Sequence, residues 1–139
     1  MATPPAPYLL DTNILLAYVR YGLLGRYIEA TYHLYTLQPS PIISIVTEGE
    51  IRAPALKFGW GSAKVAALQR LLNALTVVPL PFRNAIDAYA TIDAHCEKNG
   101  LVLSKNDLWI AATAYATGAG VLTTDHDFDP LDGLFLQRD

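Results

Sequence analysis

The sequence predicts one α/β domain in which helices cover both faces of a mostly parallel sheet of about four to five strands, a three-layer α/β/α arrangement. The length of 139 residues is that of a single domain. The composition is 52% hydrophobic and 17% charged, which supplies enough apolar side chain for a core. Short apolar runs alternate with longer helical stretches, and this alternation calls for right-handed crossovers between parallel strands.

The first third of the chain is expected to hold two strands and two helices. Residues 8–11 are a short apolar run that ends in a carboxylate, and 13–21 have helix-compatible apolar content before Gly22. A second helix is expected over 26–38, closed by a Pro-Ser-Pro turn signal. The β-branched run 42–46 then predicts a buried strand.

The middle of the chain is expected to be mostly helical. Residues 47–57 have helical spacing despite one proline, and 63–75 are rich in alanine and leucine, which are good helix formers. A third strand is expected at 76–79. A long amphipathic helix over 82–99 should end at Gly100.

The last part of the chain predicts one helix and the final strands. The helix is expected over 106–117, where glycines end it, and a fourth strand over 121–124. Residues 134–137 are a candidate fifth strand at an edge of the sheet. Residues 1–7 are expected to be a flexible leader, so that the folded domain spans 8–139.

The charge balance excludes a protein that holds nucleic acid by bulk electrostatics. The net charge is -3 and the pI is about 5.5, which is the wrong sign for attracting phosphate. A nucleic-acid function would therefore need a local site. Acidic residues that bind a divalent cation would fit, because the ion reverses the local field where phosphate approaches.

The cysteine count and the hydropathy point to the cytoplasm. Cys96 is the single cysteine, so the chain cannot form an internal disulfide, and one thiol beside His95 does not make a zinc site. No apolar run reaches the roughly 18 residues that a membrane span needs, and the first residues lack the pattern of a signal peptide. We expect no membrane partner.

Four acidic residues fall where ligands bind in a parallel α/β sheet, beyond the carboxyl ends of the strands. Asp11 and Asp125 each follow an expected strand, while Glu50 and Asp107 lie near the starts of expected helices. That four separated segments each place an acid on this side favours a common site. Carboxylate oxygens are the ligands that Mg²⁺ and Mn²⁺ prefer, and no histidine-rich set competes for zinc.

Each acid also has a purely structural interpretation. Asp11 is a favoured helix cap, and Asp125 could serve a turn. Glu50 stands three residues after Thr47, which is the capping-box spacing, and Asp107 stands three residues after a serine. Capping and metal binding are compatible, so both interpretations stay open for each residue.

Two other carboxylate-based classes fit the sequence poorly. The acids from 125 to 132 alternate like those of a calcium loop, but Pro130 stands where an EF-hand needs glycine and Leu136 where it needs glutamate. A haloacid-type phosphatase needs a second aspartate two positions after the first, and that position is Asn13.

Four motifs resemble those of a known family. Leu-Leu-Asp-Thr-Asn-Ile at 9–14 resembles the opening motif of PIN domains, and residues 44–51 resemble the second. Residues 106–112 and 122–128 match the third and fourth, and their order and spacing are those of VapC-type toxins. The similarity covers nearly the whole chain from Tyr8 onward. It implies a PIN-like fold for residues 8–139.

The resemblance also implies roles for individual residues, carried over by position. It implies four catalytic acids that bind Mg²⁺ or Mn²⁺: Asp11, Glu50, Asp107 and Asp125. The remaining candidates are one further metal ligand and two supporting polar residues: Asp127, Asn13 and Thr123. Glu48 is a less favoured alternative to Glu50. Residues 53–61 depart from the commoner Arg-Tyr-Gly continuation of the second motif without touching the acids.

The function implied is that of a metal-dependent endoribonuclease, leaving a 5′ phosphate and a 3′ hydroxyl, and acting as the toxin of a type II toxin–antitoxin pair. The expected partners are substrate RNA, a cognate antitoxin that covers the acidic site, and a second copy in a homodimer. An RNA-processing nuclease without antitoxin and a catalytically silent interaction module remain alternatives. Four basic residues flank the motifs and could attract the RNA backbone: Arg20, Arg52, Lys57 and Lys105.

Overall fold

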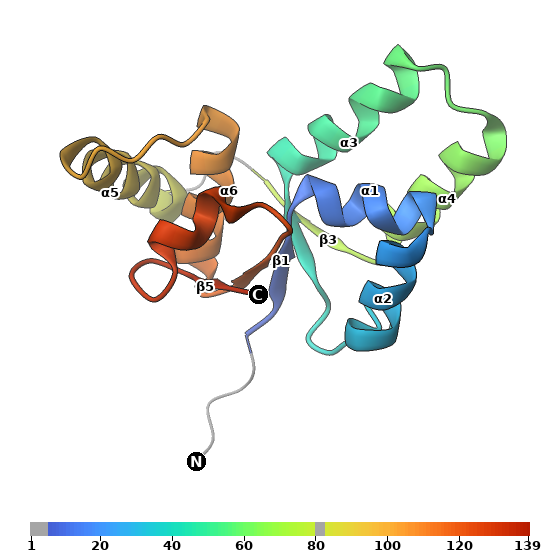
Figure 1. The fold of residues 1–139 in the computed structure, drawn as a ribbon, viewed down its shortest axis with the longest axis horizontal. Coiled ribbons are helices and arrows are strands. Elements are labelled where there is room, and N and C mark those ends of the chain that lie inside the picture. The colour runs from blue at the N-terminus through green and yellow to red at the C-terminus, as the bar shows by residue number, and fades with distance from the viewer. Residues whose placement is uncertain (1–5, 80–82) are drawn as a thin grey trace.

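The computed structural model describes residues 6–79 and 83–139 and contains a five-stranded sheet between two layers of helices (Figure 1). All strand pairs are parallel, in the order β3-β2-β1-β4-β5. The strands are β1 (Tyr8–Leu10), β2 (Ile42–Ser44), β3 (Thr76–Val78), β4 (Gly120–Leu122) and β5 (Gln137–Arg138). The predicted fold class is confirmed, and the sheet is parallel throughout.

Six α-helices and one 3-10 helix connect the strands within the described residues. They are α1 (Thr12–Arg20), α2 (Leu23–Tyr32), α3 (Ile45–Lys57), α4 (Ser62–Asn73), α5 (Arg83–Lys98), α6 (Lys105–Thr117) and η1 (His126–Leu131). In Figure 1, α5 and α6 lie on one side of the sheet and α1 to α4 on the other. None of the helices in the described residues is both long enough and apolar enough to cross a membrane.

The alternation of side chains along the central strands creates two separate cores. Leu9 and Val121 point into the core shared with α5 and α6, whereas Leu10 and Leu122 point into the core shared with α1 to α4. These four side chains are at most 3% exposed. A strand buried on both faces explains why the predicted strands are continuous apolar runs rather than alternating ones.

The expected boundary between the second strand and the third helix is wrong. The strand ends at Ser44, whose side-chain oxygen accepts a hydrogen bond from the Val46 backbone N–H (3.1 Å) and caps α3. The β-branched residues after it therefore belong to the helix. Thr47 lies inside α3 and is fully buried, so the expected capping box from Thr47 to Glu50 is also wrong.

The second helix was expected over 26–38 but spans Leu23–Tyr32. His33 adopts a left-handed conformation (φ 50°) and its N–H bonds to the Glu29 carbonyl, which ends the helix six residues before the expected end. The last strand lies at the sheet edge as expected, but at 137–138 rather than 134–137. Residues 1–5 of the expected leader, and residue 82 of the expected helix 82–99, lie outside the described residues.

Candidate active site

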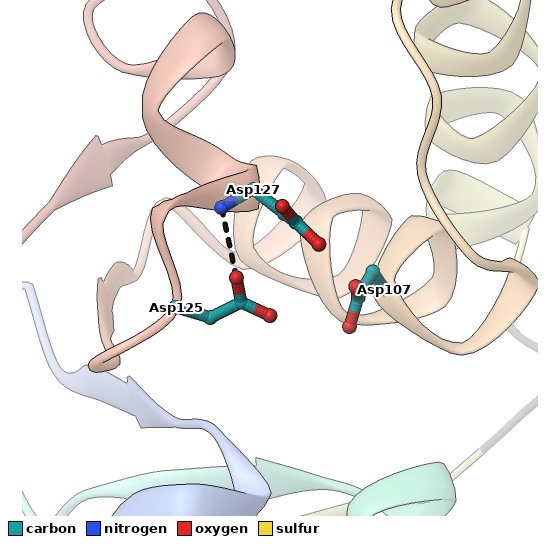
Figure 2. Close-up of side chains that lie close together, drawn as sticks. All are labelled: Asp107, Asp125 and Asp127. Atoms are coloured by element: carbon teal, nitrogen blue, oxygen red, sulfur yellow. Dashed lines mark hydrogen bonds between the residues drawn. The ribbon is translucent and has the colours of Figure 1, made fainter.

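The acidic residues meet at the edge of the sheet where β1 and β4 end. Asp107, Asp125 and Asp127 each offer a carboxylate oxygen, and these oxygens lie within 4.8 Å of one another. Figure 2 shows the three side chains turned toward a common space, from α6, from the segment after β4 and from η1. Asp11 directly follows β1 at the same edge.

Three of the acids are also tied to the start of a helix. Asp11 accepts a hydrogen bond from the Thr12 N–H (2.7 Å), and Asp125 accepts one from the Asp127 N–H (2.8 Å). The Asp107 N–H donates to the Ser104 side-chain oxygen (3.1 Å), which caps α6. Capping and clustering therefore coexist in Asp11 and Asp125, because a strand followed directly by a helix start places the cap residue at the ligand edge.

Thr123 links the ends of the two central strands. Its hydroxyl donates to Asp11 Oδ2 (2.8 Å) and accepts from the Asp125 N–H (2.9 Å), and the side chain is only 5% exposed. Nearby, Asn13 Oδ1 accepts from the Thr124 N–H (3.3 Å). Both residues that the sequence suggested as polar support therefore lie at the site, and Thr123 fixes the orientation of Asp11.

Glu50 reaches the site from the opposite helical layer. Its Oε1 accepts from the Thr12 hydroxyl (3.1 Å) and its Oε2 from the Asn106 side-chain amide (3.2 Å). Sequence reasoning gave neither Thr12 nor Asn106 a role, although each directly adjoins an acid within a motif. Glu48 instead pairs with Arg52 one turn along α3 (3.7 Å). Asp11 and Glu50 do not belong to the three-oxygen group of Asp107, Asp125 and Asp127.

The site concentrates negative charge that is partly shielded from water. Burial, and after it the charges of Asp11 and Asp125, raise the pKa of Asp107 from 3.8 to about 6. Burial also raises the pKa of Asp11, against a hydrogen bond from Thr123 that lowers it, and the charges of Glu50 and Asp125 raise it further. A cation would relieve this repulsion. The converging carboxylate oxygens are a donor set that fits Mg²⁺ or Mn²⁺.

We expect Thr123→Val to slow the RNA cleavage that the family resemblance implies by about 10–100-fold, the usual effect of removing a group that orients a metal ligand, which is the role expected of Asp11. Valine keeps the shape but leaves Asp11 without its hydroxyl donor and the Asp125 N–H without its acceptor. The variant should also bind Mn²⁺ more weakly in calorimetry, which a purely structural role would not cause.

The matched control for that variant is Thr113→Val. Thr113 is fully buried too, but its hydroxyl bonds to the backbone of its own helix, at Trp109 (2.8 Å). If both variants bound Mn²⁺ as the wild type does, Thr123 would not be a positioning residue.

Comparisons with known proteins agree with this geometry. A model of the family "PIN domain" matches residues 8–134. The chain is 30% identical to "Ribonuclease VapC5" of Mycobacterium tuberculosis, over 96% of this chain and 93% of that protein. It is 26% identical to a chain of VapBC-1 from nontypeable Haemophilus influenzae, with a TM-score of 0.73 and coverage of 95% and 96%. A chain of DNA-bound VapBC from Salmonella typhimurium shares the fold (TM-score 0.78, 21% identity, coverage of 97% and 98%). The chain belongs to the PIN domain family.

Proposed function

We propose that the protein is a metal-dependent endoribonuclease that hydrolyses RNA phosphodiester bonds and acts as the toxin of a type II toxin–antitoxin pair. The observation that carries the proposal is the clustering of acids from separate segments at the ligand edge of a parallel sheet. A relative that matches 96% of the chain is named a ribonuclease, and the similar solved structures include VapBC complexes.

The proposed catalytic and metal-binding residues are Asp11, Glu50, Asp107 and Asp125, with Asp127 as a further metal ligand. When bound, Mg²⁺ or Mn²⁺ supplies Lewis-acid polarisation of the phosphodiester and an activated water. Hydrogen bonds within the protein hold the proposed metal-binding carboxylates in place before an ion binds. Thr123 orients Asp11, while Thr12 and Asn106 orient Glu50 from two different helices.

The experiment that tests this function is a sequencing map of RNA ends after the chain is expressed without any partner. New ends with 5′ phosphates, absent when Asp125→Asn is expressed, are the expected result. An identical set of RNA ends in the cultures that express the wild type and Asp125→Asn would contradict the nuclease function. It would favour a catalytically silent interaction module, and such a module need not bind Mn²⁺.

Besides its RNA substrate, we propose that the protein binds an antitoxin protein that covers the acidic site. The VapBC complexes among the similar structures support this pairing. A small gene immediately upstream, whose product binds DNA and inhibits cleavage when added to the purified chain, would favour the toxin over an RNA-processing nuclease. We also propose a cytoplasmic location, in keeping with the one buried and unpaired cysteine, Cys96.

We expect the protein to form a homodimer through apolar helix surface. Tyr21 and Tyr27 are 51% and 64% exposed, and a small protein with a 52% hydrophobic composition gains by covering such side chains. Sedimentation velocity at micromolar concentration should therefore give a single species of twice the chain mass of 15.2 kDa. A species of the chain mass at these concentrations would contradict the dimer.

A further inference from the structure

A groove of about 330 Å³ lies between α1 and the start of α2. At one end it is lined by Asn13 and Thr124, which are hydrogen-bonded to each other (3.3 Å) beside Asp125. At the other end it is lined by Arg20. Thr124 directly precedes Asp125 in the chain, so this end of the groove lies next to the acidic site.

One face of α1 forms the floor of the groove. Asn13, Leu16, Ala17 and Arg20 follow the i, i+3, i+4, i+7 spacing that places side chains on the same helix face. A rise of 1.5 Å per residue separates the backbone of Asn13 from that of Arg20 by about 10 Å. The floor therefore has a polar group near the acids, an apolar middle and a cation at the far end.

The start of α2 forms the wall. Gly25 lets α2 approach α1 closely, because a Cβ at this position would collide with the Ala17 carbonyl oxygen. The wall carries two exposed leucines, Leu23 at 88% and Leu24 at 45% exposure. Such exposed leucines beside a groove offer an apolar surface to a flat ligand.

The charge of Arg20 indicates which class of ligand this groove can bind. Among the described residues, Arg20 enters none of the ion pairs, unlike Arg52 and Arg138, which are bound to carboxylates. Its guanidinium remains available for a phosphate, the anion that Arg recognises most readily. An arginine, two exposed leucines and an amide around one groove offer separate contacts for the phosphate, the base and the ribose of a nucleotide.

We propose that this groove binds the nucleotide next to the scissile phosphate, with Arg20 on its far phosphate and Leu23 and Leu24 against its base. The inference rests on the ribonuclease function proposed above and adds a substrate-positioning residue to it. Arg20 acts on a phosphate that does not react, so it contributes to substrate binding more than to the chemical step.

The first test is Arg20→Ala, assayed on a short single-stranded RNA of mixed sequence with Mn²⁺. Loss of one charged hydrogen bond should raise KM about tenfold with kcat little changed. The plot of log(kcat/KM) against log salt concentration should become shallower by about 0.7, the loss of one phosphate contact on a single strand. Arg83→Ala, an exposed arginine at the start of α5, is the matched control and should behave as wild type.

The second test is Leu23→Ala, which should raise KM several-fold without changing the salt dependence, since no charge is lost. Leu56→Ala is its control, because Leu56 is 87% exposed at the far end of α3. Unchanged KM and salt dependence in the Arg20 and Leu23 variants would overturn the proposal. That result is also expected if the groove serves a protein partner instead of RNA.

A binding measurement separates this inference from the nuclease function. Adenosine and uridine 5′-monophosphates, which contain no bond to cleave, are titrated into the protein with Mg²⁺ and followed by NMR. Shifts of the Leu24 and Thr124 amide signals that disappear in Arg20→Ala would support the groove, even if the wild type cleaved no RNA. Shifts of equal size in the wild type and the variant, or none in either, would overturn it.

Discussion

Replacing Asp107 with asparagine should abolish RNA cleavage, with a fall in kcat of about a thousandfold or more and an intact fold. The carboxylate of Asp107 belongs to the three-oxygen group with Asp125 and Asp127. Metal ions contribute several kcal/mol to stabilising the transition state of phosphoryl hydrolysis, and about 4 kcal/mol corresponds to a thousandfold in rate. Asparagine keeps the size of the side chain but removes the negative charge that we propose holds the ion.

The fold should survive because the substitution leaves the α6 cap intact. The backbone N–H of residue 107 still donates to Ser104, and no apolar side chain is lost. Cleavage by the purified variant is measured with added Mg²⁺ and with added Mn²⁺, alongside circular dichroism. Asp87→Asn, an exposed acid on α5 far from the cluster in sequence, is the control and should cleave normally. Activity like that of the wild type in Asp107→Asn would remove Asp107 from the site.

The pattern of the strands made the fold predictable from sequence alone. The central strands are buried on both faces, as Leu9 and Leu10 show by entering different cores, so each strand is a plain apolar run. A parallel sheet then collects the residues that follow its strands at one edge. That rule alone placed Asp11 and Asp125 near each other, without any knowledge of side-chain contacts.

Contacts between distant segments could not be predicted in the same way. Thr12 and Asn106 bond to Glu50 across 38 and 56 residues, and nothing in local spacing indicates which polar neighbour of an acid will do so. The predicted end of β2 was wrong for a related reason. Ile45 and Val46 have strand propensity, but the Ser44 side chain caps a helix there and the tertiary packing of α3 outweighs that preference.

Cleavage should require a divalent cation, and the metal-free protein should bind RNA weakly. The chain carries a net charge of -3, and its clustered carboxylates repel phosphate until a cation neutralises them. RNA affinity is measured on one preparation by fluorescence anisotropy, first with chelator and then with Mn²⁺. We expect binding at least about tenfold tighter with the ion, the change produced by about 1.4 kcal/mol. Equal affinity under the two conditions would defeat the electrostatic argument.

The burial of Asp107, together with repulsion from Asp11 and Asp125, should make the metal-free wild type less stable than Asp107→Asn. The pKa of Asp107 is raised to about 6 in the folded protein, above the value of about 3.9 in an unfolded chain, so the folded state binds protons more tightly. The stability that the protonated form provides is complete below about pH 4 and is lost as the pH rises through about 6. Asparagine does not titrate, so its contribution to stability does not change with pH. The variant should therefore be more stable than the wild type at neutral pH and equally stable at acidic pH.

The size of this gain is modest because Asp107 is only half-buried and water screens its charge. After that discount we expect about 1 kcal/mol at neutral pH, a rise in Tm of about 3–5 °C for a domain of this size. Tm is measured for both proteins with chelator at neutral pH and near pH 4, where the difference should vanish. A lower Tm for the variant at neutral pH would mean that the negative charge of Asp107 stabilises the start of α6 more than the neighbouring acids oppose it. Its main role would then be at the helix terminus rather than at a metal site.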